Sequence, residues 1–392
     1  MLTFASIVLS WQCAPRHAAP ASAHRVALSA ASAWRHGRGH GSPQMIASSA
    51  SSAPVESLAA PLRWSEEPDH LWTFTGWSAA PSLTVNYIAA GPEDGQPFLL
   101  IHGFGASGFH WRRNVPALAA AGYRVYAIDL LGFGLSAKPI IDYDSRLWRE
   151  QCAAFLREVA GCGEASGRRA VVAGNSIGGY CALAVGATYP ELCLGVASLN
   201  GAGRFTPPPE EEAARRHAEE ARAARGPLRV AVDEAIARLV TAVQRGVAYA
   251  GLLVTKQPLR IKQVLQQVYP VAPEQADDEL VASIVYAADD APGLAPAGGI
   301  PEVFYRIVSR NSNGGSEPVD VLIKQLKVPL LLLWGERDPW VVSALGDAAQ
   351  ACAEECGVDV RRVSVDAGHC PQDEAPRQVN AGLMAFAAEL GA

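Results

Sequence analysis

The chain lacks the sequence features of several protein classes. No apolar run in its 392 residues approaches the roughly 18 to 20 residues of a membrane-spanning helix. It has no Lys/Arg-rich run of the kind that binds nucleic-acid phosphates, its formal net charge is −6, and only 18% of its residues are charged. We therefore expect no transmembrane segment and no nucleic-acid partner. An exposed apolar surface would still allow peripheral contact with a bilayer.

The cysteines show no pattern of metal binding. None of the eight forms a C-x-x-C pair, and no Cys/His set has the spacing of a zinc site, so we expect no metal. Cys352 and Cys356 lie four residues apart in a predicted helix and share a face. We interpret them as small core residues, with a redox pair as the alternative. Such usage is typical of a reducing compartment.

Acidic residues are missing from residues 1–55, since the first one is Glu56. The segment is rich in Ala and Ser and carries four arginines: Arg16, Arg25, Arg35 and Arg38. A basic, Ser-rich and acid-free N-terminus is typical of an organellar transit peptide. We predict targeting to the chloroplast, with the mitochondrion as the alternative. A low-complexity tail without a targeting role is the competing interpretation.

The rest of the chain alternates short apolar runs with amphipathic helical stretches. The runs predicted as strands are residues 83–89, 98–101, 125–128, 170–173, 196–199, 330–334 and 360–365. Short continuous apolar strands that alternate with helices indicate a mostly parallel, doubly wound α/β sheet covered on both faces. With 49% apolar residues, the chain can build such a core from residues 56–200 and 328–392.

One region interrupts the alternation. Residues 201–327 contain almost no strand-like run and predict several helices, the first of them highly charged with Glu and Arg three and four apart. A helical insertion between two core strands is where a cap over an active site would lie. We therefore expect residues 201–327 to form a cap, and its length favours a large apolar substrate.

The sharpest local signal is G-x-S-x-G at residues 174–178, directly after an apolar strand and before a helix. A sharp strand-to-helix turn holds the hydroxyl of Ser176 clear of the backbone, and small glycines let the chain approach itself. The N-terminus of the following helix offers N–H groups to a developing oxyanion. Ser176 is therefore the predicted nucleophile, and the backbone N–H of Ile177 is a predicted oxyanion donor.

A second glycine-rich turn follows the strand at residues 98–101 and begins with His102, Gly103 and Phe104. We predict that the backbone N–H of Phe104 is the second oxyanion donor. His102 is a rival for the general base, but its place at a strand end suits a role in bracing the loop. The order of nucleophile, acid and base along the chain also favours a later histidine.

That order is completed by two later loops. Asp338 lies four residues beyond a predicted strand end, and His369 lies in the loop after the next strand. Imidazole can remove the serine proton while a carboxylate fixes its tautomer, so we predict a triad of Ser176, His369 and Asp338 and no cofactor. Three competing acids fit the order less well: Glu336, Asp366 and Asp373. Trp340 is a predicted pocket residue, whereas Asp129 is interpreted as structural.

Several longer segments resemble a plastid group of α/β-hydrolases that includes pheophytinase and chlorophyll dephytylase. The segments are HGFGASGFHWRRN, YAIDLLGFGLSAKP, LWREQ, GNSIGGY, LLLLWGERDPW, AGHCPQDEAP and the cap stretch LRIKQVLQQVYPVAP. The resemblance implies an α/β-hydrolase fold, the same three catalytic residues, hydrolysis of a phytyl ester of a chlorophyll-type pigment, and no metal. The charged helix after Phe205 has no counterpart that we can match in that group.

Other functions remain open at this stage. Haloalkane dehalogenases and epoxide hydrolases share the turn after the first core strand but have Asp at the nucleophile position, so Ser176 argues against both. Hydrolysis of an unrelated small ester, perhydrolysis and C–C bond hydrolysis are compatible with the triad. A hydrolase-fold receptor with very slow turnover is the alternative from a different class. The oligomeric state is not indicated.

Overall fold

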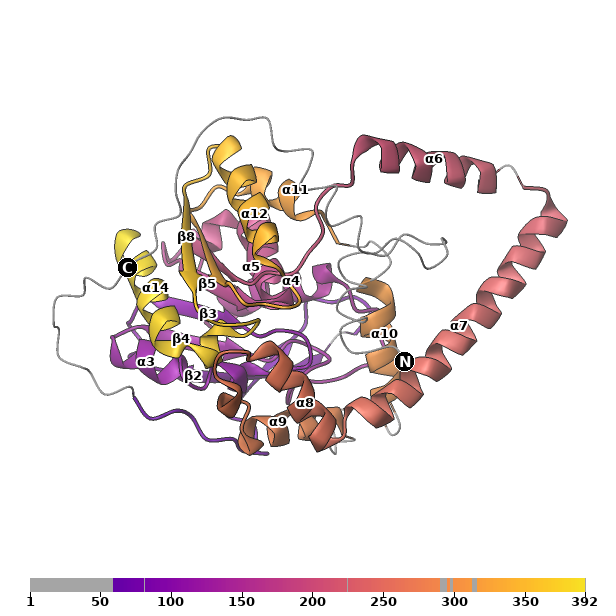
Figure 1. The fold of residues 1–392 in the computed structure, drawn as a ribbon. Coiled ribbons are helices and arrows are strands. Elements are labelled where there is room, and N and C mark those ends of the chain that lie inside the picture. The colour runs from indigo at the N-terminus through magenta and orange to yellow at the C-terminus, as the bar shows by residue number, and fades with distance from the viewer. Residues whose placement is uncertain are drawn as a thin grey trace.

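The computed structural model describes residues 59–391, except 81, 224, 290–294, 297–298 and 312–315. The predicted transit peptide at residues 1–55 lies outside this range. An eight-stranded sheet forms the centre of the molecule (Figure 1), in the order β1-β2-β4-β3-β5-β6-β7-β8. Its strands are β1 (His70–Phe74), β2 (Leu83–Ala90), β3 (Pro97–Ile101), β4 (Arg124–Ile128), β5 (Ala170–Asn175), β6 (Cys193–Leu199), β7 (Leu330–Gly335) and β8 (Val360–Val365).

The sheet is mostly parallel, as the sequence predicted. Strands β3 to β8 pair in parallel, whereas β2 runs antiparallel to both β1 and β4. All seven predicted strands are present. Strand β1 was not predicted, because its residues HLWTF alternate weakly and most of them stay exposed at the sheet edge.

Two hydrophobic cores lie on opposite faces of the sheet because successive side chains of a strand point to opposite sides. In β3, Leu99 and Ile101 join one core while Phe98 and Leu100 join the other. The first core is covered by α4 (Ser145–Glu158), α5 (Ile177–Thr188), α11 (Val319–Gln325) and α12 (Ser343–Glu355), and the second by α3 (Val115–Ala120) and α14 (Pro376–Glu389). This arrangement explains why central parallel strands such as β3 and β7 are apolar and fully buried, whereas β8 at the sheet edge carries Arg361 and Arg362.

Five α-helices of the described part of the chain lie between β6 and α11. They are α6 (Pro209–Ala223), α7 (Pro227–Thr255), α8 (Pro258–Val268), α9 (Asp278–Ala288) and α10 (Ile300–Asn311). Helices α8 and α9 form a small third core together with Phe109 and Cys370 from the loops above the sheet. In Figure 1, α6 and α7 stand away from the sheet, while α8, α9 and α10 lie beside it.

The structure also bears on the expectations about the cysteines, membrane-spanning helices and two tryptophans. The seven cysteines within the described residues are all free. Cys352 is half-buried and Cys356 is exposed, so the interpretation of this pair as core residues is wrong for Cys356, which follows the last turn of α12. Among the described residues, no helix is both long and apolar enough to cross a membrane. Trp111 and Trp148 are buried packing residues, as expected.

Candidate active site

Ser176 occupies a sharp turn between β5 and α5. Its φ is +56°, a left-handed conformation that residues other than glycine rarely adopt. A Cβ added to Gly174 would lie 2.1 Å from the carbonyl oxygen of Gly178, and one added to Gly178 would lie 2.2 Å from that of Ile101. Both glycines of the motif are therefore required by close backbone contacts, and the strained turn presents the serine at the end of the sheet.

His369 and Asp338 are hydrogen-bonded to each other. The Nδ1 atom of His369 lies 2.7 Å from Oδ2 of Asp338, and both side chains are buried. Because a carboxylate can only accept, Nδ1 carries the proton and the lone pair of the imidazole remains on Nε2. This is the tautomer that a general base acting through Nε2 requires.

Three further donors hold the Asp338 carboxylate in place. Its Oδ1 accepts from the backbone N–H groups of Trp340 (2.7 Å) and Val341 (3.0 Å), and its Oδ2 accepts from Nδ2 of Asn200 (2.8 Å). Asn200 also exchanges two hydrogen bonds with the backbone of Gly335. Sequence reasoning missed Asn200, although a polar residue directly after the buried strand β6 was a signal that could have identified it.

The three competing acids are engaged elsewhere. Glu336 accepts from the hydroxyls of Ser343 and Ser364, and these bonds with nearby Arg362 lower its pKa against the effect of burial. Asp366 pairs with Arg337 at the surface. Asp373 is buried and accepts from the guanidinium of Arg112. None of these carboxylates is within hydrogen-bonding distance of the His369 ring.

His102 braces the loop that begins with it. Its Nδ1 donates to the carbonyl of Gly103 (2.7 Å), and its Nε2 accepts from the backbone N–H of Leu130 (3.0 Å). Burial lowers its pKa. Both ring nitrogens are therefore used in backbone contacts, which leaves none for proton transfer to Ser176.

Asp129 has a similar bracing role in the neighbouring loop. Its carboxylate accepts from the backbone N–H groups of Gly108 (2.6 Å) and Leu135 (2.7 Å) and from the side chain of Asn86 (3.0 Å). These bonds hold together two of the loops that border the cavity beside Ser176.

The cavity brings together five of the six predicted site residues. Ser176, His369, Phe104, Ile177 and Trp340 line it, and its volume is about 170 Å³. Asp338 lies behind His369 and does not line the cavity. The Trp340 ring packs against the His369 ring with 5.2 Å between their centroids.

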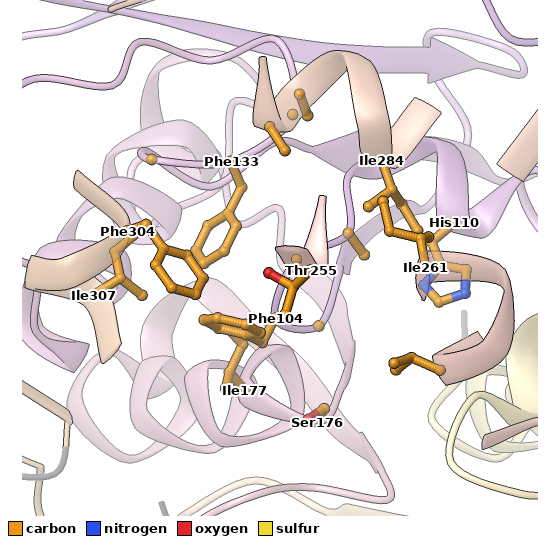
Figure 2. Close-up of a pocket in the computed structure, with 18 of the residues that line it drawn as sticks. Phe104, His110, Phe133, Ser176, Ile177, Thr255, Ile261, Ile284, Phe304 and Ile307 are labelled. Carbon is orange, nitrogen blue, oxygen red and sulfur yellow. The ribbon is translucent and has the colours of Figure 1, made fainter. Parts of the chain in front are cut away.

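Most of the cavity wall is apolar. Figure 2 shows Phe133, Phe304 and Ile307 on one side and Ile261 and Ile284 on the other, above Ser176. Four of these residues belong to the insertion between β6 and β7: Ile261 on α8, Ile284 on α9, and Phe304 and Ile307 on α10. The arrangement can hold an apolar molecule against the serine.

A buried ionic cluster fastens α8 and α9 to the loop that carries His369. Arg112 bonds Asp373 next to that loop and Asp277 at the N-terminus of α9. The hydroxyl of Tyr269 donates to Asp373 (3.1 Å) and accepts from Nε2 of His110 (2.6 Å). Burial lowers the pKa of His110 to about 4, so this histidine is neutral near pH 7.

Glu374 completes this connection. Its Oε1 accepts from the backbone N–H groups of Val271 (2.6 Å) and Ala272 (2.9 Å), and its Oε2 accepts from that of Gly368, the residue before His369. Sequence reasoning did not single out Arg112, Tyr269 or Glu374, because the segments that they join lie more than 90 residues apart in the chain.

No group of three or more His, Cys, Asp and Glu side chains in the described part of the chain is placed to hold a metal ion. The residues around Ser176 are instead a hydroxyl, an imidazole and backbone N–H groups, which suit acid–base and nucleophilic chemistry.

Comparison with known proteins places this site in a family context. Residues 96–376 match the family model described as the alpha/beta hydrolase fold. The chain is 28% identical over 337 residues to chloroplastic pheophytinase of Arabidopsis thaliana. The alignment covers 76% of this chain and 63% of that protein. It is also 37% identical over 127 residues to 2-hydroxy-6-oxo-6-(2'-aminophenyl)hexa-2,4-dienoic acid hydrolase of Metapseudomonas resinovorans. This alignment covers 32% of this chain and 41% of that protein. The chain thus spans less than two thirds of the length of these two relatives.

Solved structures show the same fold. A thermophilic esterase from Thermogutta terrifontis superposes with a TM-score of 0.58 at 19% identity, over 82% of this chain and 99% of that one. An enol-lactonase from Burkholderia xenovorans LB400 superposes with a TM-score of 0.56 at 17% identity, over 78% of this chain and 97% of that one. With the family match over most of the chain, these findings show that the protein belongs to the α/β-hydrolase-fold family, in which it is similar to pheophytinase.

Proposed function

We propose that the chain is a serine hydrolase that cleaves a carboxylic ester through an acyl-enzyme. The observation that carries the proposal is the buried hydrogen bond between His369 and Asp338 beside a strained Ser176 at one cavity. A merely structural serine has no need of a left-handed turn, which costs on the order of 1 to 3 kcal/mol.

The reaction follows from these groups. Nε2 of His369 takes the Ser176 proton as Oγ attacks the ester carbonyl, and the backbone N–H groups of Phe104 and Ile177 stabilise the oxyanion. When the C–O bond breaks, His369 returns the proton to the leaving alcohol. Water then attacks the acyl-enzyme and gives a proton to His369, which passes it to Oγ as the acid leaves. Asp338 keeps the tautomer and stabilises the imidazolium.

The substrate we propose is an apolar ester, and specifically the phytyl ester of a pheophytin- or chlorophyll-type pigment. The apolar cavity wall and the 28% identity to a protein named chloroplastic pheophytinase support this choice. An unrelated smaller ester is the alternative. The same relative supports a chloroplast location, with residues 1–55 as the transit peptide.

We also propose that the insertion between β6 and β7 acts as a cap. The end of α7 and helices α8, α9 and α10 each contribute residues to the cavity wall, including Leu252, Ile261, Ile284 and Phe304. The cap would shield the apolar part of the substrate from bulk water and select the substrate by its shape.

The test is to incubate the purified chain with pheophytin a, chlorophyll a and a short p-nitrophenyl ester, and to score phytol release by chromatography. Ser176→Ala is the control. Phytol release that this variant loses would support both the esterase activity and the pigment substrate. If only the short ester is hydrolysed, and Ser176→Ala abolishes this hydrolysis, the result would support Ser176 as the nucleophile and contradict the pigment as substrate.

The same assay separates an enzyme from a slow-turnover receptor. Many turnovers of any ester per Ser176 would exclude the receptor interpretation. A single slow turnover, with the acyl group retained on Ser176 by mass spectrometry, would contradict an enzymatic role and favour a receptor.

A further inference from the structure

His110 is a polar residue in the mostly apolar wall of the cavity. It lies in the short helix η1 (Gly108–Trp111), and only 4% of its surface is exposed. Figure 2 shows its ring beside Ile261, with Phe133 and Phe304 on the other side of the cavity. Burial of a polar group is unfavourable unless the group is hydrogen-bonded. The bonds of the two ring nitrogens therefore decide what this part of the cavity can bind.

A chain of hydrogen bonds fixes the proton of the His110 ring. Asp373 accepts from the guanidinium groups of Arg112 and Arg113, and a carboxylate has no proton to donate. The hydroxyl of Tyr269 has one proton and donates it to Asp373 over 3.1 Å. The same hydroxyl lies 2.6 Å from Nε2 of His110 and must accept there, so Nε2 carries the ring proton.

The other ring nitrogen, Nδ1, is left as a hydrogen-bond acceptor. Burial lowers the pKa of His110 to about 4, so the ring is neutral near pH 7 and Nδ1 keeps its lone pair. Burial and the charge of Asp373 raise the pKa of Tyr269, so its hydroxyl keeps the proton that it donates. The chain of bonds therefore ends in a lone pair on Nδ1 at neutral pH.

Nδ1 has no hydrogen-bond partner within the protein. In the described part of the chain, it is the one buried side-chain nitrogen or oxygen without a partner that belongs to a residue of the cavity wall. The lysine, asparagine and threonine side chains of the wall each have a bond within the protein: Lys138, Asn175, Thr255 and Lys256.

The ring presents Nδ1 to the cavity. Tyr269, the partner of Nε2, does not belong to the cavity wall, whereas His110 does. The two nitrogens of an imidazole point to nearly opposite sides of the ring. With Nε2 turned toward Tyr269 and away from the cavity, Nδ1 lies on the cavity side.

We propose that Nδ1 of His110 is a binding site for a hydrogen-bond donor, and that the substrate carries a hydroxyl or N–H group that donates to it. A buried acceptor selects such a ligand, because a ligand without the donor leaves the acceptor unpaired. The statement about the substrate rests on the proposed ester hydrolysis, whereas the binding of a donor requires no turnover.

The first experiment follows the binding of indole and of indene to the purified full chain by nuclear magnetic resonance. The two molecules have the same shape, but indene has a CH₂ group where indole has its N–H. In a chain labelled with ¹⁵N-histidine, we expect Nδ1 of His110 to show no bound proton and to shift with indole but not with indene. His369, which carries its proton on Nδ1, gives the opposite pattern in the same spectrum.

The second experiment compares the two affinities in the wild type and in His110→Leu, which removes the acceptor. The preference for indole over indene is expected to be about 10-fold larger in the wild type, because only there does indene leave a buried acceptor unpaired. Thr255→Val is the matched control: it removes a hydroxyl of the cavity wall that already bonds the carbonyl of Leu252, and should keep the preference.

Tyr269→Phe tests the chain of bonds rather than the acceptor itself. It removes the hydroxyl that holds the ring proton on Nε2 and leaves the size of the side chain almost unchanged. We expect a proton on Nδ1 in part of the molecules and a smaller preference for indole. A variant that is only less stable would lose neither the tautomer nor the preference. Circular dichroism checks that every variant is folded.

Pairs of esters test the statement about the substrate. p-Nitrophenyl 6-hydroxyhexanoate is compared with p-nitrophenyl heptanoate, and 6-hydroxyhexyl hexanoate with heptyl hexanoate, so a hydroxyl replaces a methyl group in either part of the ester. In at least one pair, His110→Leu should lower the ratio of kcat/KM for the hydroxy ester to that for the methyl ester about 10-fold.

Three results would overturn the binding site, and the first two need no variant. They are a proton on Nδ1 of His110 in the free chain, an Nδ1 resonance that indole does not shift, and a preference for indole that His110→Leu leaves unchanged. Ester ratios that His110→Leu does not change in either pair would overturn the statement about the substrate. Binding of indole as expected, without hydrolysis of any ester, would instead contradict the proposed ester hydrolysis and leave the donor site standing.

Discussion

The backbone N–H of His369 donates a hydrogen bond to the carbonyl of Val268 at 3.0 Å. His369 lies in the loop after β8, and Val268 is the last residue of α8 in the insertion between β6 and β7. The proposed general base is thus attached directly to the proposed cap. We therefore expect a movement of α8 to displace His369 and to open the cavity together, which would couple substrate entry to the position of the proposed base.

Glu374 is expected to control this coupling. Glu374→Gln keeps the size of the side chain but removes the charge that three backbone N–H groups share. Hydrogen bonds to a charged group contribute about 1.5 to 3 kcal/mol each. We expect kcat for a short ester to fall about 10- to 100-fold, together with a lower free energy of unfolding. Ester turnover and urea unfolding measure the two effects.

Glu336→Gln is the matched control, because Glu336 accepts two serine hydroxyls near the surface. It is expected to keep its kcat. A Glu374→Gln enzyme with unchanged kcat would show that His369 does not depend on the attachment to the cap.

Asn200 is expected to position Asp338 without touching the substrate. Asp338→Asn should lower kcat/KM by about 10⁴-fold, because an amide in place of the carboxylate favours the wrong histidine tautomer. Asn200→Ala removes one of four hydrogen bonds to Asp338 and also frees the backbone of Gly335. We expect kcat to fall about 10-fold while KM changes little. A large rise in KM alone would contradict a positioning role.

The sequence predicted the sheet well because its information is local. Seven strands and the helices between them follow from apolar runs and turn residues, which depend on near neighbours. Ser176 was identifiable because the steric demands of its turn require glycines two positions away on either side. His369 and Asp338 followed from their order after particular strands.

The interactions that join distant segments were not predictable in this way. Arg112 binds Asp277 and Asp373, which are 165 and 261 residues further along the chain. No periodicity or local motif links such positions. The exposure of large aliphatic residues along α7, such as Leu239 and Val243, was equally hidden, since a helix normally turns its apolar residues toward the core.

The buried His110 predicts a pH dependence of stability. Its pKa is about 4 in the folded state and about 6.5 in an unfolded chain. Below pH 6.5 the unfolded state binds the proton more strongly, so stability is complete above that pH and decreases as pH falls toward 4. One unit of pKa difference corresponds to about 1.4 kcal/mol, so lowering the pH from 7 to 5 should cost on the order of 2 kcal/mol through this residue.

His110→Gln tests this contribution by urea unfolding at pH 7 and pH 5. Glutamine cannot take up a proton, so the loss of stability between the two pH values should be smaller by about 2 kcal/mol than in the wild type. Part of the dependence should persist, because the pKa of His102 is also lowered by burial. An identical loss in both proteins would show that His110 is not buried in the folded state.

Two glycines offer opposite outcomes for the same substitution. In Gly178→Ala the new methyl group would lie 2.2 Å from the carbonyl oxygen of Ile101 in β3, a backbone atom that cannot move without distorting the sheet. We expect a loss of about 3 kcal/mol or more in the free energy of unfolding and no measurable ester turnover.

In Gly246→Ala, on the exposed side of α7, the methyl group meets no atom within 4 Å. Replacing glycine by alanine inside a helix should there stabilise the protein by up to about 1 kcal/mol. Thermal unfolding of the two variants compares them directly, and a stable, active Gly178→Ala would contradict the close contact between the serine turn and β3.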